Sequence, residues 1–386
     1  MVSVALTKLG RIVSGSLDSP WVEGDTVIVK DGKIKEVGRG LNVEDCDRIY
    51  DCNGMILTPG LINSHAHVAM GDFTPRQLTI NFIESELHGG VTSMISAGEV
   101  HVPGRPRDAA GVKALAILNA KAFRNFRPGG VKVLGGTLIL EPGLTEKDFE
   151  ELAGEGVKTV KIGLGKVFKP EHGAAQMVAW ARKYGIKSMM HTGGTSLAEV
   201  PVVTADDVLA VNPDVACHIN GGPTAPPIPD VEKLVKQGAM ALEIVQCGNP
   251  KVAAEALRMA KENNALGRVI FGNDAPSGTG VIPLGILRNI AFAASICGIP
   301  AEAAIAMATG NTAKVYELPR GLVKPGLEAD LIVMDKPVGS VGGDALKALE
   351  AGDLPGIALI MVDGEVKTLR SRNTPPPLRK VKLVKG

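Results

Sequence analysis

The sequence predicts an α/β protein: a (β/α)8 TIM-like barrel joined to a small β-sandwich that the N- and C-terminal segments form together. Two observations predict this fold class. Between Gly60 and Leu318, eight strand-like apolar runs alternate with helical segments over about 250 residues, the usual length of such a barrel. Short β-rich runs flank this region on both sides. We therefore expect residues 1–59 and 319–386 (with a tail) to form the sandwich and residues 60–318 the barrel.

The flanking segments contain strong hairpin signals. Residues 25–38, "DTVIVKDGKIKEVG", hold two β-rich runs around Asp31-Gly32, a dipeptide typical of a two-residue hairpin turn. A further turn is expected at Asn53-Gly54. At the other end, "GLVKPGLEADLIVMD" and "IALIMVDGEVKT" read as strands, the second with Asp363-Gly364 at its turn. The two flanking segments are therefore expected to pair with each other.

Within the barrel, the apolar runs and the helical periodicity place each element. The expected strands are 60–64, 92–95, 131–134, 159–162, 188–191, 215–219, 241–245 and 269–272. The expected helices are 75–89, 109–126, 145–154, 170–184, 204–211, 231–237 and 249–264.

The composition excludes several classes of protein. Apolar residues make up 45% of the chain but aromatic residues only 3%, so the core must be aliphatic. A net charge of +1 provides no electrostatic footprint for nucleic acid or an anionic membrane. No apolar run reaches the roughly 18 residues of a membrane span, and no signal peptide is expected. The five cysteines form no Cys-x-x-Cys pair, so we expect a reducing, cytoplasmic environment.

Histidines at strand ends are the main functional signal. His65 and His67 lie two apart at the end of the first barrel strand, so both rings face the same way. His191 and His218 lie at the ends of the fifth and sixth strands, and Asp274 follows the eighth. Barrel active sites lie at this carboxyl end. Imidazole and carboxylate groups there suit zinc, iron or a similar divalent ion.

Each of these residues also has a plain structural interpretation. A single His-x-His pair or strand-end histidine is more often a core or loop residue, and an aspartate such as Asp274 is common in turns. The convergence of all five at one end of the barrel favours a metal site. His88 and His172 do not fit this pattern and are expected to be structural, and His101 is a candidate loop contact.

Lys161 ends the predicted fourth strand, where burial of its charge would be costly. One interpretation is a lysine that reaches solvent or pairs with an acid. The other is that CO2 adds to its neutral amine and that the resulting carbamate bridges two metal ions.

Several motifs resemble those of a known superfamily. "TPGLINSHAHV", "HTGGTS", "HINGGPT", "FGNDAPSG" and "GLVKPGLEADLIVMD" resemble the amidohydrolase superfamily over nearly the whole chain. Longer stretches resemble the members that hydrolyse cyclic enamides: "MISAGEVHVPGRPRDAAG", "EIVQCGNPK", "VIFGNDAPSGTGVIPLGILRN" and the tail "SRNTPP".

This resemblance implies a barrel with a sandwich and a binuclear site. His65 and His67 would hold one metal, His191 and His218 the other, with carboxylated Lys161 bridging them at a position where some members carry glutamate. Asp274 would ligate the first metal and act as the base. The two divalent ions are expected to be zinc, with iron or manganese as options. Metal-bound hydroxide would cleave the C–N bond of a small cyclic amide. A homo-oligomer, by resemblance a tetramer, is also expected.

A substrate that carries a carboxylate requires a cation near the site. Arg105 and Arg107 are candidates, as are Arg76 and Lys166. For any single one of these residues, a solvated charge on a loop is the simpler interpretation. Pocket-forming residues are expected after the strand-end histidines: Thr192, Gly193 and Gly194, and Asn220 to Gly222. The loop 277–280, "SGTG", lacks the Gly-Lys-Ser/Thr ending of a phosphate-binding loop, so nucleotide binding is not expected.

Three alternatives stay open. The bridging lysine also suits a dihydroorotase- or hydantoinase-like cyclic amidase. A mononuclear deaminase on the same fold would carry a glutamate after the fifth strand, where this chain has Ser196, Leu197 and Ala198. A non-enzymatic scaffold would be expected to have lost ligands, whereas every ligand position here is filled.

Overall fold

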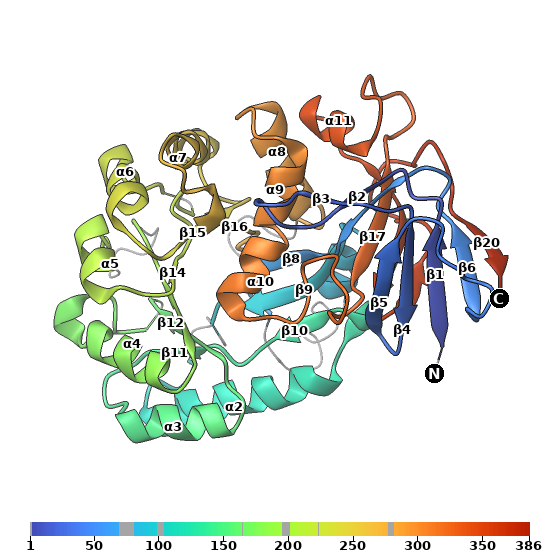
Figure 1. Cartoon of the computed structure of the whole chain (residues 1–386). Coiled ribbons are helices and arrows are strands. Elements are labelled where there is room, and N and C mark those ends of the chain that lie inside the picture. Colours follow the sequence, from blue (N-terminus) through green and yellow to red (C-terminus); the bar gives the residue numbers. More distant parts are fainter. Residues whose placement is uncertain are drawn as a thin grey trace.

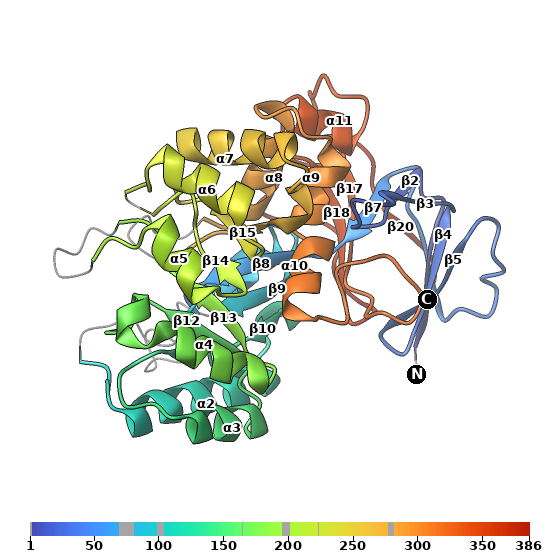
Figure 2. The same ribbon diagram turned by 60° about the vertical axis from the view of Figure 1, so that its left-hand side comes forward.

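The barrel and the sandwich lie side by side in the computed structural model, and both termini are on the sandwich (Figures 1 and 2). The structure describes residues 2–68, 81–98, 104–163, 165–194, 201–222, 224–276 and 282–386. The predicted positions Arg76, His101 and 277–280 lie outside these ranges, as do residues 75–80 of the first predicted helix.

Parallel strands at all eight predicted places form the barrel wall. They are β8 (Leu61–Ala66), β9 (Val91–Ser96), β10 (Lys132–Leu134) with β11 (Leu138–Ile139), β12 (Thr159–Ile162), β13 (Lys187–Met190), β14 (Val215–Ala216), β15 (Ala241–Val245) and β16 (Val269–Gly272). β9 pairs with β10 and β12 pairs with β11, so these two short pieces together occupy the third position. The wall closes between β16 and β8, where the Asp274 N–H donates to the His65 carbonyl at 2.9 Å. The predicted barrel is confirmed.

Helices cover the outside of the barrel (Figure 1). Residues 81–87 are helical, and the later helices are α2 (Ala109–Asn125), α3 (Glu146–Gly154), α4 (Ala174–Lys183), α5 (Ala205–Val211), α6 (Ile228–Gln237), α7 (Pro250–Glu262), α8 (Gly285–Ser295), α9 (Ala301–Met307), α10 (Gly310–Tyr316) and α11 (Ala345–Glu350). Single 3-10 turns occur at η1 (Pro128–Gly130), η2 (Pro170–His172) and η3 (Leu266–Arg268). Helices α8 to α11 were not predicted from the sequence.

One predicted helix is divided. The range 170–184 is a 3-10 turn followed by α4, because Gly173 between them has a left-handed φ of +81°. A continuous α-helix cannot include that conformation. α7 begins at the predicted place because the Asn249 side chain accepts hydrogen bonds from the N–H groups of Lys251 and Val252, and Pro250 takes the first helical position.

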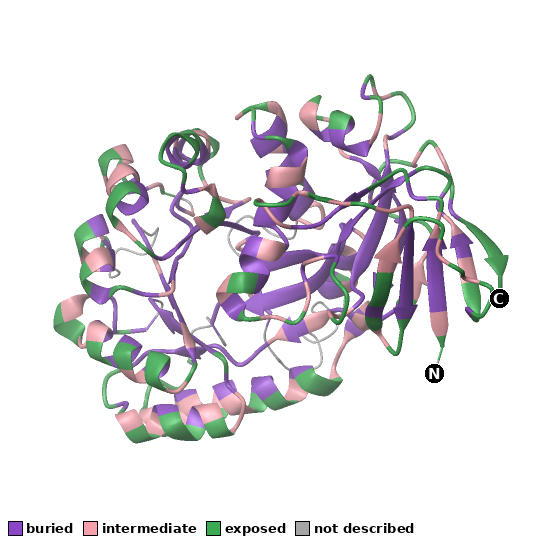
Figure 3. Cartoon of the chain, in the orientation of Figure 1, coloured by how far each residue is buried: buried purple, intermediate pink, exposed green. Residues whose placement is uncertain are grey.

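The core has two layers around the barrel wall. Aliphatic side chains between the strands and the helices form the largest cluster, and the strands are almost wholly buried (Figure 3). A second cluster fills the lumen with side chains from several strands, among them Ile62, Met189, Val215 and Ile270, together with Tyr316 of α10. The barrel is therefore packed below its carboxyl end, which leaves that end for a site.

Two sheets form the sandwich. The first has the strand order β20-β6-β1-β4-β5 and the second β19-β18-β17-β7-β2-β3. The strands are β1 (Ser3–Thr7), β2 (Arg11–Val13), β3 (Trp21–Val22), β4 (Thr26–Lys30), β5 (Lys33–Gly38), β6 (Arg48–Asp51), β7 (Ile56–Pro59), β17 (Leu331–Asp335), β18 (Gly356–Val362), β19 (Glu365–Thr368) and β20 (Lys382–Lys385). The pairs β7–β17 and β6–β20 join the two ends of the chain, as predicted. The domain boundaries at 59/60 and 318/319 stay a prediction.

The predicted turns are found, although one of them has a different role. Asp31 and Asp363 have left-handed φ angles of 54° and 50°, each followed by a glycine of positive φ, and both close hairpins. Asn53-Gly54 also turns with positive φ, but it carries the chain from β6 in one sheet to β7 in the other.

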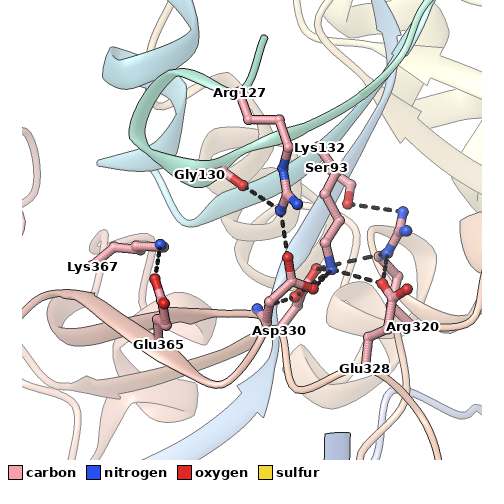
Figure 4. Close-up of polar contacts among 10 residues, drawn as sticks. Ser93, Arg127, Gly130, Lys132, Arg320, Glu328, Asp330, Glu365 and Lys367 are labelled. Carbon is pink, nitrogen blue, oxygen red and sulfur yellow. Dashed lines mark hydrogen bonds and ion pairs between the residues drawn. The ribbon is translucent and has the colours of Figure 1, made fainter. Parts of the chain in front are cut away.

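A charged cluster joins the barrel to the C-terminal segment, at the start of β10 and away from the strand-end histidines (Figure 4). The Lys132 Nζ lies 2.6 Å from Glu328 Oε2, 2.8 Å from Asp330 Oδ1 and 2.6 Å from Asp363 Oδ1. Arg320 pairs with Glu328 at 2.7 Å, and Arg127 with Asp363 at 2.5 Å. We call these six residues the Lys132 cluster.

Candidate metal centre

The four strand-end histidines meet at the carboxyl end of the barrel. His65 lies in β8 and His67 just after it, while His191 follows β13 and His218 follows β14. Ring centroids are 5.2 Å apart for His65 and His67, 5.5 Å for His65 and His218, and 4.8 Å for His191 and His218. The structure therefore brings all four rings into one group.

Asp274 joins this group from the end of β16. Its Oδ1 lies 2.7 Å from His67 Nε2 and 3.3 Å from His65 Nε2, and its Oδ2 lies 3.4 Å from Cys247 Sγ. Ligand atoms of His65, His218 and Asp274 all lie within 4.8 Å of one another. Asp274 and His218 have left-handed φ angles of 57° and 36°, a conformation that costs energy outside glycine and often marks functional sites.

Buried polar atoms in this group lack protein partners. Among the described residues, Lys161 Nζ, His191 Nε2 and His218 Nδ1 are buried and make no hydrogen bond. An unsatisfied buried polar atom costs roughly 1–3 kcal/mol, so three in one place require an explanation. Cations bound between the imidazoles would satisfy the ring nitrogens, and the donor set therefore fits a metal centre.

The pKa shifts of His67, His191, His218 and Asp274 favour the form of these residues that binds metals. His65 differs, because burial lowers its pKa but Glu243 and Asp274 hold the pKa well above its ordinary value. Burial, followed by the charge of Lys161, lowers the pKa of His191 to about 4. Burial also holds the pKa of His218 well below its ordinary value and lowers that of His67. For Asp274, burial raises the pKa, but His65 and His67 together outweigh burial, and the net pKa is far below the ordinary value. Neutral imidazoles and an ionised carboxylate are metal ligands at pH 7.

Glu243 of β15 is a buried acid beside the histidine group that was not predicted from the sequence. Its Oε2 lies 2.6 Å from His65 Nδ1, and its Oε1 accepts from the Ser64 hydroxyl at 2.6 Å. Burial raises the pKa of Glu243, but His65 and its other partners lower it on balance, so the group is ionised. The available signal was an acidic residue inside the apolar strand "ALEIV".

A second buried network holds the strand ends together. The Asn63 side-chain oxygen accepts from the N–H groups of His65 at 3.1 Å and Asn273 at 3.0 Å. The Asn273 amide in turn donates to both oxygens of Glu86 at 2.8 Å. Burial raises the pKa of Glu86 well above its ordinary value. This network links β8, β16 and the helical residues 81–87 directly behind His65 and Asp274.

The predicted substrate cations differ in their surroundings. Arg105 is buried, and its guanidinium lies 2.5 Å from Glu141, a fully buried acid that also accepts from the Lys166 N–H at 2.9 Å. Arg107 is exposed.

The predicted pocket residues hold the backbone in place. Gly193 pairs with Val203 through two backbone hydrogen bonds. The Asn220 side chain exchanges hydrogen bonds with the Val245 backbone, both at 2.9 Å. Thr192 is buried beside them. Their roles toward a substrate stay proposals.

The remaining described histidines have structural contacts. His88 Nδ1 accepts from the Arg372 N–H at 3.3 Å, and His172 Nδ1 accepts from the Phe168 N–H at 3.2 Å. Both contacts agree with the structural role expected for them.

Gly163, after β12, controls how closely the chain approaches His191. Its φ is +106°, and an added Cβ would lie 2.6 Å from the His191 Cβ. We expect Gly163→Ala to displace His191 and to lower the metal content of protein loaded with Zn²⁺ about tenfold, with a loss of roughly 1–3 kcal/mol in stability. Gly326→Ala is the control, because Gly326 has a φ of +92° but open space around it. Equal metal content in the two variants would contradict this expectation.

The fold and site together define a class. The sequence profile of the amidohydrolase family matches residues 56–369, and the chain belongs to that family. At the level of individual proteins, the chain is 54% identical to enamidase from Eubacterium barkeri over the full length of both. A crystal structure of enamidase superimposes with a TM-score of 0.95 at 53% identity, covering 99% of this chain and 100% of the other.

More distant relatives are similar in sequence or in fold. Adenine deaminase from Ruegeria sp. (strain TM1040) is 24% identical over 81% of this chain and 51% of its own length. A Xaa-Pro dipeptidase structure has a TM-score of 0.65 at 14% identity, covers 94% of this chain and 99% of its own, and shows the fold alone. Of the helices described, none has the length and apolar character of a transmembrane span.

Proposed function

We propose that this chain is an enamidase-like hydrolase that opens a cyclic amide at its C–N bond with the help of two divalent metal ions. The observation that carries the proposal is the convergence of His65, His67, His191, His218 and Asp274 around Lys161 at the carboxyl end of the barrel. The full-length similarity to enamidase supports the choice of reaction.

In this proposal, His65 and His67 hold one ion and His191 and His218 the other. Lys161 is 1% exposed, and its amine has no hydrogen-bond partner among the residues described, so no described group competes for the nitrogen to which CO2 would add. The carbamate would supply a further anionic ligand for the metal ions. Zinc suits the imidazole ligands, and iron or manganese can also bind them.

The metal pair, when bound, supplies Lewis acidity that ionises water and polarises the amide carbonyl. The chain supplies the proton transfers. Asp274 is ionised, and its Oδ1 faces the histidine group, so it can take a proton from the attacking water. The same oxygen can then deliver this proton to the departing nitrogen, which completes ring opening.

The substrate in this proposal is a cyclic enamide with a carboxylate. Arg107 is exposed, whereas Arg105 is paired with the buried Glu141. Both remain candidates for the carboxylate. Backbone groups of Thr192, Gly193 and the turn at Asn220 would line the substrate pocket.

Metal removal tests the proposal. We expect two ions per chain, and we expect chelation to lower hydrolysis of a carboxylated cyclic enamide at least about 100-fold, with recovery when zinc, iron or manganese is returned. Dihydroorotate, hydantoin and adenine, assayed in parallel, separate the alternative cyclic amidases and deaminases. Full turnover by metal-free protein, or faster release of ammonia from adenine, would sink the proposal.

A further inference from the structure

We propose that Glu243 is a positioning residue for the metal centre: it sets which nitrogen of His65 faces the metals and fixes the backbone at His218. The inference rests on the proposed function, since it concerns the same centre. It assigns a role to a residue outside the ligand set, on the seventh barrel strand, 178 residues from His65 in the chain.

Both oxygens of the Glu243 carboxylate make contacts with neighbouring residues. Oε1 accepts from the Ser64 hydroxyl at 2.6 Å, and Oε2 lies 2.6 Å from His65 Nδ1. Oε2 also accepts from the His218 N–H at 3.3 Å. The side chain is 0% exposed, so no solvent competes for these contacts. One carboxylate thereby touches residues from both proposed metal pairs.

The contact at Nδ1 determines the orientation of the His65 ring. Because Nδ1 is occupied by Glu243, Nε2 is the nitrogen left to face the centre, and it lies 3.3 Å from Asp274 Oδ1. A carboxylate that accepts from one imidazole nitrogen makes the other a better metal ligand. The buried negative charge also favours binding of dications a short distance away.

Glu243 also holds the strained backbone at His218. The His218 N–H donates to Oε2, and the N–H of the next residue, Ile219, donates to the Glu243 backbone carbonyl at 2.8 Å. His218 itself has a φ of 36°. Two hydrogen bonds to one residue of β15 therefore bracket the left-handed position and keep the ring in the centre.

Packing alone does not account for an acid at this position. The lumen cluster just below it is formed by apolar side chains such as Ala241, Ile270 and Met189, and Glu243 is fully buried above them. An apolar residue of similar volume would avoid the desolvation cost of a buried charge. The placement of the carboxylate against His65 and His218 indicates a role toward the centre.

The test compares metal affinity across four variants of the full chain. Metal-free protein is titrated with Zn²⁺ in competition with a chromophoric chelator, and with Co²⁺ for its visible absorption spectrum. We expect Glu243→Ala to weaken binding of one ion about 10- to 100-fold and to change the Co²⁺ spectrum. Glu243→Gln keeps the volume and an acceptor but loses the charge, and should lie between Glu243→Ala and the unchanged protein. Ser64→Ala leaves the His65 contact and should have a small effect.

Asp335→Asn is the matched control. It also replaces a 0% exposed carboxylate by an amide, but Asp335 lies at the end of β17 in the sandwich, where it pairs with Arg379. We expect it to lower the urea midpoint without changing metal affinity. Glu243→Ala leaves a cavity, so metal affinity is also measured for Glu243→Gln, which keeps the volume of the side chain.

The outcomes separate the two proposals. If the unchanged protein binds no ions, the proposed function fails. If it binds two ions and both Glu243 variants bind them equally well with the same Co²⁺ spectrum, the positioning role is wrong and the metal centre stands. An equal loss of affinity in Asp335→Asn would show a general effect of destabilisation and would also overturn the positioning role.

Discussion

Replacing Asp274 by asparagine should lower kcat/KM for a cyclic amide about 1000-fold, within the range for loss of a general acid–base group. Asparagine keeps the shape of the side chain but cannot accept a proton. Asp274 is the ionised carboxylate that faces the histidine group, with its Oδ1 2.7 Å from His67 Nε2. The measurement is kcat/KM together with metal content, so that loss of a ligand and loss of the base are told apart.

The control for Asp274 is the same substitution at the opposite end of the barrel. Asp214 precedes β14, and its carboxylate accepts from the Ser188 N–H at 2.8 Å and hydroxyl at 2.7 Å. Asp214→Asn should therefore lower stability and leave turnover near that of the unchanged protein. If Asp274→Asn retained a tenth or more of the original kcat/KM with both metals bound, the assignment of Asp274 as the base would be wrong.

Replacing Lys132 by methionine should destabilise the protein by about 3–5 kcal/mol, the usual result of removing one partner from a buried ion pair. Lys132 is 12% exposed and Asp330 only 1%, and the substitution leaves Asp330, Glu328 and Asp363 close together without their shared cation. The free energy change is measured from the shift of the urea midpoint. Because the Lys132 cluster lies away from the metal centre, metal affinity should not change.

Lys367→Met tests whether the loss of stability expected for Lys132→Met comes from the burial of its ion pairs. Lys367 pairs with Glu365 close to the Lys132 cluster (Figure 4), but Glu365 is 74% exposed. A pair of this kind contributes less than about 1 kcal/mol. Similar midpoints for the two variants would mean that the Lys132 cluster does not join the barrel to the C-terminal segment as the contacts indicate.

Much of the fold could be predicted because it depends on local patterns. Apolar runs placed every barrel strand, and Asp-Gly pairs placed two hairpin turns, since both follow from backbone and side-chain preferences within a few residues. The break in the predicted helix at Gly173 was not predicted, because glycine is tolerated in many helices. The left-handed φ of Gly173 depends on the surrounding structure and not on the local sequence. α8 to α10 were not predicted because they follow the eighth strand as three successive helices, outside the regular alternation of strands and helices.

For the site, the sequence by itself determined which side chains reach the carboxyl end of the barrel: His65 and His67 share a side because strand side chains alternate with period two, and His191, His218 and Asp274 follow strand ends. Only the tertiary structure decided that Glu243 accepts from His65 and that Arg105 is paired with Glu141. Such partners are far apart in the chain, and they meet only after the barrel closes and the strand register is set. No local pattern carries that information, because it depends on all the strands at once.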